Sequence, residues 1–146
     1  MGEARAALAD FIEVARLGGV ELSPNELSAE FLPAPHRAPT RLPVGTMAVY
    51  AFWGDGGWLK VGKVGPNSNA RYTSQHYSAG SALSTLAGSL TASRPADAGF
   101  DPADCGAWIK SRTHRLNVLM PATRPRELLS LLEAFLHLRL RPRFEG

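Results

Sequence analysis

The sequence predicts an α/β fold: a small three-stranded antiparallel sheet flanked by helices. Two β-prone runs, 46–53 and 58–64, are joined by the glycine-rich segment 54–57, and a third run follows at 113–120. A leucine-rich pattern at helical spacing occupies residues 125–140. Because the order is hairpin, helices, strand and helix, a single sheet covered by helices is favoured. The chain of 146 residues is long enough for one ordinary domain.

The first 43 residues are expected to form a helical extension and a connector ahead of the main domain, 44–146. Apolar residues recur at helical spacing until Gly18: Ala6, Leu8, Phe11, Ile12, Ala15 and Leu17. Ser23 followed by Pro24 and Glu26 is typical of a capped helix start, which predicts a second short helix ending before Pro33. Four prolines then keep residues 33–43 extended.

The main domain opens with the predicted hairpin, whose turn is Gly54-Asp55-Gly56-Gly57. A helix is expected from Ser68 to about Tyr77, and another within the small-residue segment 78–92. A short helix is expected at residues 103–110. The third strand ends at Pro121, and the last helix, 125–140, ends before Pro142.

Composition excludes several classes of protein. Hydrophobic residues make up 45% and charged residues 20%, and no apolar run approaches the roughly 20 residues of a membrane span. The acidic N-terminal segment lacks the basic start of a secretory signal. The single cysteine, Cys105, excludes an internal disulfide and a cysteine-cluster metal site. We therefore expect a cytoplasmic protein.

Charge is distributed unevenly along the chain. Residues 1–40 hold three basic and six acidic side chains, whereas residues 41–146 hold thirteen basic and seven acidic ones. A basic domain suits an anionic partner, and nucleic acid is the partner that this balance favours.

Several motifs occur in an order that resembles the GIY-YIG nuclease family. Val49-Tyr50-Ala51 and Lys60-Val61-Gly62 are similar to its paired signature, with Arg71 and His76 on the next helix and Glu133 on a late helix. The resemblance covers roughly residues 46–146. Lys60 stands where the second triplet usually begins with tyrosine, as in branches of the family with Lys-Val-Gly. Glu145 stands where an asparagine is usual.

The resemblance implies a metal-dependent endonuclease that hydrolyses DNA phosphodiester bonds, with Tyr50, Lys60, Arg71, His76 and Glu133 as catalytic residues. Glu133 suits a single Mg²⁺ or Mn²⁺ ion, since Mg²⁺ is usually held by one or two carboxylates together with water and substrate oxygens. Arg71 would clamp a phosphate. Tyr50 would position or deprotonate water if a cation lowers its pKa. Lys60 would be that cation, or would bind phosphate in place of the usual tyrosine. His76 is the alternative base.

The same resemblance predicts a wider nucleic-acid surface. Gly62 would let substrate approach the strand backbone closely. The other expected contacts are Lys63, Gln75, Lys110, Arg112, Arg141 and Arg143. Trp53 and Trp58 flank the hairpin turn, where they either pack on the core or stack on bases.

Two other readings remain open. One is a catalytically weakened binding module of the same fold that grips nucleic acid or a protein, as the changes at Lys60 and Glu145 would allow. The other is an interaction protein that forms a homodimer through its N-terminal helices. The sequence does not decide between DNA and RNA, or between single and double strands.

Overall fold

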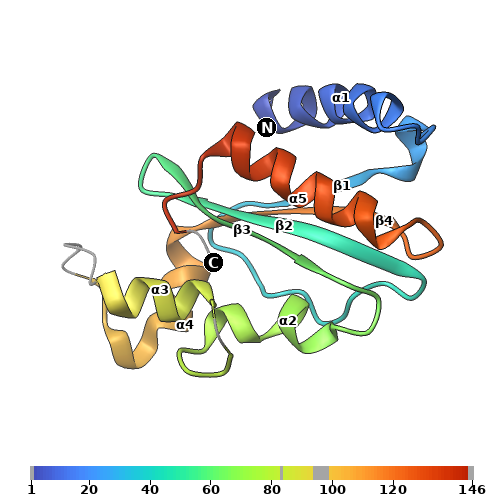
Figure 1. The fold of residues 1–146 in the computed structure, drawn as a ribbon. Helices are drawn as coiled ribbons and strands as arrows, with labels where there is room; N and C mark the ends of the chain where they lie inside the picture. The colour runs from blue at the N-terminus through green and yellow to red at the C-terminus, as the bar shows by residue number, and fades with distance from the viewer. Residues whose placement is uncertain (1, 83, 94–98, 145–146) are drawn as a thin grey trace.

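The computed structural model describes residues 2–82, 84–93 and 99–144. Its architecture is mixed α/β, built on an antiparallel sheet of four strands in the order β1-β4-β2-β3 (Figure 1). The strands are β1 (Ser28–Leu32), β2 (Thr46–Gly54), β3 (Gly57–Val64) and β4 (His114–Pro121).

Helices cover both faces of this sheet (Figure 1). The upper face in the figure carries α1 (Gly2–Leu17) and α5 (Arg126–Leu140). The lower face carries α2 (Asn69–Thr73), α3 (Leu86–Ser93) and α4 (Cys105–Arg112). Three short 3₁₀ turns complete the described elements: η1 (Pro24–Glu26), η2 (Gln75–Tyr77) and η3 (Pro102–Asp104). None of the described helices is long and apolar enough to cross a membrane.

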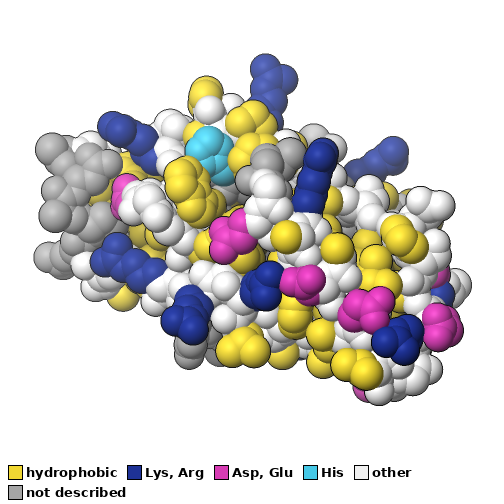
Figure 2. Space-filling view, turned by 90° about the horizontal axis from the view of Figure 1, so that it is seen from above, with side chains coloured by type: hydrophobic (Ala, Val, Ile, Leu, Met, Phe, Trp, Pro, Cys, Tyr) yellow, Lys and Arg dark blue, Asp and Glu magenta, His cyan; other side chains and the backbone are white. Residues whose placement is uncertain are grey.

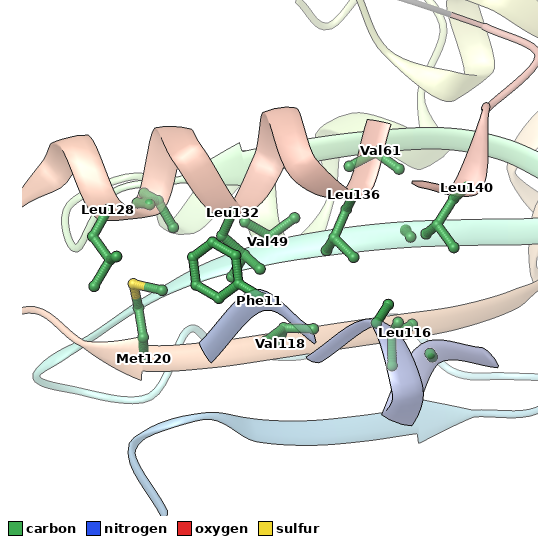
Figure 3. Close-up of a cluster of buried hydrophobic side chains, with 14 of the residues drawn as sticks. Phe11, Val49, Val61, Leu116, Val118, Met120, Leu128, Leu132, Leu136 and Leu140 are labelled. Atoms are coloured by element: carbon green, nitrogen blue, oxygen red, sulfur yellow. The ribbon is translucent and has the colours of Figure 1, made fainter. Parts of the chain in front are cut away.

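The upper core explains why α5 forms where the leucine pattern predicts it. Leucines spaced four residues apart lie on one stripe of the helix and point down onto the strands (Figure 3). They meet a layer from α1, β2, β3 and β4: Phe11, Val49, Val61, Leu116, Val118 and Met120. The buried residues of α1 belong to the same cluster. The apolar residues predicted for this helix are therefore partly used within the chain: Phe11 and Ala15 are buried, whereas Ala6 and Leu17 are exposed.

The alternation of β2 sends its side chains to both faces. Val49 and Ala51 face the upper core, whereas Tyr50 and Phe52 face the lower core with residues of α2, α3 and α4. Since both faces are covered, the strand is apolar throughout and almost wholly buried. Tyr50 is thus held on the central part of the lower face.

The prediction of three strands is wrong, because residues 28–32 form a fourth strand where a helix was expected. Ser23 and Glu26 do form the predicted capping box, but only a single 3₁₀ turn follows. A helix that short is marginal alone, while the exposed edge of β4 offers backbone partners. Ser28–Leu32 pairs antiparallel with that edge, so Ser28 lies opposite Leu119. The N-terminal segment therefore contributes to both the sheet and the core.

The small-residue segment is helical over less of its length than predicted. Among the residues of this segment that the structure describes, only those of Leu86–Ser93 form a helix. Before it, Gly80 has a positive φ of 78°, and Ser81 Oγ donates to the carbonyls of Gln75 and Ser78. These side-chain bonds compete with helix hydrogen bonds and keep this stretch in turns.

Candidate functional site

The hydroxyl of Tyr50 is the centre of a polar cluster on the lower face. Arg71 Nε–H donates to Tyr50 Oη at 3.2 Å. His76 Nε2 lies 2.5 Å from the same oxygen. Arg71 comes from α2 and His76 from η2, the two short elements that cross this face. The structure thus brings together three of the residues that the sequence selected.

The backbone determines which nitrogen of His76 carries the proton. The amide N–H of Leu86, at the start of α3, donates to Nδ1 at 3.1 Å. Nδ1 must therefore be unprotonated, so Nε2–H donates to Tyr50 Oη. Burial, followed by the charges of Arg71 and other basic groups, lowers the pKa of His76 to about 3. His76 is consequently a neutral donor that positions Tyr50, and the geometry does not suit it as a base.

Two opposing effects act on the pKa of Tyr50. Burial raises that pKa above its ordinary value, and the charge and hydrogen bond of Arg71 oppose the increase. Because Oη already accepts two hydrogen bonds, its own proton is directed toward a third partner. The cation in direct contact is Arg71, whereas the sequence suggested Lys60.

Gly62 gives Tyr50 the space it occupies. The two residues lie opposite each other in the β2–β3 ladder. A Cβ on Gly62 would lie 2.5 Å from Tyr50 Oη and 2.8 Å from Cζ. Gly62 therefore makes room for the tyrosine ring, and its contact with substrate stays a prediction.

Lys60 is a buried amine on the same face. It lies opposite Phe52 in the ladder and is only 1% exposed. Within the described part of the chain, its Nζ has no hydrogen-bond partner. Burial and then the charge of Arg71 lower its pKa, while Glu133 opposes them. A buried cation beside a second cation is costly unless an anion joins it.

Glu133 approaches from the other side of the sheet. It lies on α5, and its Oε2 forms an ion pair with Lys63 Nζ at 2.6 Å. Lys63 lies opposite Val49 and so faces the upper layer. Because β3 is the outer strand, the carboxylate still acts across it and influences the pKa of both Lys60 and Tyr50.

The described residues offer few ligands for a metal ion at this site. Among the described residues, no three of His, Cys, Asp or Glu gather as a ligand group. Glu133 offers one carboxylate, and Lys63 engages one of its oxygens. That set fits Mg²⁺ or Mn²⁺ if water and phosphate oxygens supply the other ligands, and it does not fit an ion held by protein alone.

Arg115 is a central residue that sequence reasoning missed. It is fully buried, and its guanidinium carbon lies 5.3 Å from the centre of the Tyr50 ring and 4.8 Å from that of Tyr72. It donates to Asn117 Oδ1, to the carbonyl of Tyr72 and to the hydroxyl of Tyr77. The signal was its spacing from Asn117, since strand residues two apart share a face.

His36 links the proline-rich connector to this network. Its Nδ1 lies 2.7 Å from the carbonyl oxygen of Thr113, so that nitrogen carries the proton and donates. Its Nε2 then accepts from the hydroxyl of Tyr77 at 2.9 Å. The connector is therefore anchored beside Arg115, because Tyr77 contacts both groups.

The other predicted nucleic-acid contacts are dispersed. Gln75 lies in η2, Lys110 and Arg112 end α4, and Arg141 caps α5. The amide of Arg143 donates to the carbonyl of Trp58 along the outer edge of β3. Glu145 lies outside the described residues. On the side that carries α1 and α5, acidic side chains lie among the basic ones (Figure 2). Lys60 and Arg71 are therefore the better candidates for phosphate binding.

Comparison with protein-family models, curated proteins and solved structures gave no match.

Proposed function

We propose that the protein is a metal-dependent endonuclease that hydrolyses DNA phosphodiester bonds with a GIY-YIG-like domain. One observation carries the proposal. The hydroxyl of Tyr50 is held by two donors, Arg71 and His76, on the same sheet face as the buried amine of Lys60, which has no hydrogen-bond partner among the described residues. This combines an anion-binding group with a positioned oxygen.

A phosphate is the anion that suits Lys60 and Arg71. Burial removes water from the Lys60 amine, and the positive charge of Arg71 further destabilises its protonated form. An anion bound between the two groups would offset both effects. A phosphodiester would supply that charge and accept charge-assisted hydrogen bonds from both groups. These interactions strengthen as charge accumulates on the phosphoryl oxygens, so they favour the transition state over the bound substrate.

Tyr50 then acts on the attacking water. Arg71 Nε–H and His76 Nε2–H both donate to Oη, an arrangement that stabilises the phenolate. The phenolate would accept the proton of a water molecule as that water attacks phosphorus. Since burial raises the pKa of Tyr50, this form is scarce at neutral pH and hydrolysis should accelerate in alkaline solution.

Glu133 would hold the Mg²⁺ or Mn²⁺ ion through its carboxylate. The bound ion would supply Lewis-acid stabilisation of the phosphoryl oxygens. Lys63 now pairs with this carboxylate and would have to share it. That ion pair favours one alternative, a module of the same fold that binds nucleic acid without cleaving it.

Cleavage of plasmid and single-stranded DNA with Mg²⁺ or Mn²⁺ tests the proposal. Wild-type protein should nick DNA, and Tyr50→Phe and Glu133→Gln should each lose at least about 100-fold in rate. Glu127→Gln is the matched control, because Glu127 is an exposed glutamate on the same helix. Salt-sensitive DNA binding without cleavage by the wild type would favour the binding module.

A further inference from the structure

A second pocket lies on the sheet face opposite Tyr50. Its volume is about 260 Å³, and five residues line it: Glu3, Phe31, Trp53, Trp58 and His114. They come from α1 and from all four strands. In the β2–β4 ladder Trp53 lies opposite His114, and the adjacent pair, Phe52 and Arg115, faces the other side. This pocket is therefore separate from the proposed catalytic site.

Aromatic rings form most of its wall. The ring of His114 stacks on Phe31 with a centroid distance of 5.5 Å and lies 5.1 Å from the ring of Trp53. Trp53 is 37% exposed although its strand is otherwise almost wholly buried. Trp58, only partly buried, lies opposite Trp53 in the hairpin. The fold thus brings four aromatic rings, those of Phe31, Trp53, Trp58 and His114, to the wall of one small space.

The carboxylate of Glu3 is the anionic group that lines the pocket. Trp58 Nε1–H donates to Glu3 Oε2 at 3.5 Å, a long bond that leaves the exposed carboxylate able to bind another group. The amide of Ala34 donates to His114 Nδ1, so that nitrogen is unprotonated. None of the five lining residues is a lysine or arginine.

We propose that this pocket binds an organic cation, a quaternary ammonium or trimethylated amine. Cations are attracted to the negative faces of aromatic rings, and an adjacent carboxylate adds direct charge complementarity. A nucleotide base could also stack on these rings, but Glu3 would repel its phosphates and no lining cation would compensate. Charge complementarity therefore selects the cation.

Titration with choline tests the proposal at constant ionic strength, with tryptophan fluorescence and the indole N–H signals in NMR spectra as readouts. The neutral isostere 3,3-dimethyl-1-butanol, which has the same shape without the charge, should bind at least about tenfold more weakly. Glu3→Gln should weaken choline binding by about fivefold to tenfold. Glu13→Gln, an exposed site on the same helix, should leave it unchanged. Trp53→Ala should abolish the response.

Three results would overturn the proposal: equal binding of choline and its neutral isostere, no effect of Glu3→Gln, or saturable binding of thymidine monophosphate without binding of choline. The last result would identify a base-stacking site instead. If Trp53→Ala does not fold, the Glu3→Gln comparison decides, because Glu3 lies exposed near the start of α1. The assay contains no DNA, so its outcome is independent of the proposed nuclease activity.

Discussion

The contact between Gly62 and Tyr50 allows the site to be perturbed by a single methyl group. In Gly62→Ala the new Cβ would lie 2.5 Å from Tyr50 Oη, 2.8 Å from Cζ and 3.0 Å from Cε2. Ordinary van der Waals contact begins near 3.4 Å, so the ring or the strand must move. The hydroxyl would shift by roughly 1 Å, the difference between these distances.

Such a shift disturbs the bonds that define the cluster. The hydrogen bonds of 2.5 Å to His76 and 3.2 Å to Arg71 cannot both keep good geometry. Overpacking costs about 1–3 kcal/mol, and each weakened hydrogen bond costs about 1 kcal/mol. We therefore expect Gly62→Ala to lose about 2–4 kcal/mol of unfolding free energy, or roughly 5–12 °C in Tm. DNA cleavage should fall about 100-fold, as expected for a reacting group displaced by 1 Å.

Urea denaturation and plasmid nicking measure these two effects. Gly57→Ala is the matched control, because Gly57 begins the same strand and a Cβ there would meet nothing within 4 Å. Tyr50→Ala removes the clashing ring, so adding Gly62→Ala to it should cost less than about 1 kcal/mol. A clash between Gly62 and Tyr50 is excluded if Gly62→Ala matches Gly57→Ala in stability and cleavage, or if the full loss of stability persists in the Tyr50→Ala background.

Three further predictions follow from buried groups. The pKa of His76 falls from 6.5 to about 3 on folding, so its unfolded form binds a proton that the folded form does not. Stability should therefore decline as the pH falls from 6.5 toward 3, by about 2 kcal/mol at pH 5, and His76→Gln should flatten this dependence in urea titrations. Arg115→Met should cost about 3 kcal/mol, since Tyr77, Asn117 and a backbone carbonyl lose their donor, whereas the exposed Arg112→Met should change stability by less than about 0.5 kcal/mol in the same assay. The cleavage rate should rise with pH up to at least about pH 9 because burial raises the pKa of Tyr50, and a rate that is flat above neutral pH would exclude the phenolate as base.

Local patterns determined much of the fold. The hairpin, the third predicted strand and the leucine-rich helix all form, with boundaries within a residue or two of those expected. These elements depend on alternation, turn residues and helical spacing, which neighbouring residues encode. Tyr50, Arg71 and His76, which the family resemblance grouped, do lie together in the structure.

Long-range packing decided the rest. Whether residues 28–32 became helix or strand depended on the free edge of β4, almost ninety positions away. Arg115 and Asn117 alternate with apolar neighbours, a pattern typical of a strand with one solvated face, yet His36, Tyr72 and Tyr77 cover that face. The sequence by itself thus determined the hairpin, the strand that ends at Pro121 and the leucine-rich helix, and it indicated most of the residues that could carry chemistry. Only the tertiary structure decided which faces are covered, and burial is what makes Lys60, His76 and Tyr50 depart from their ordinary pKa values.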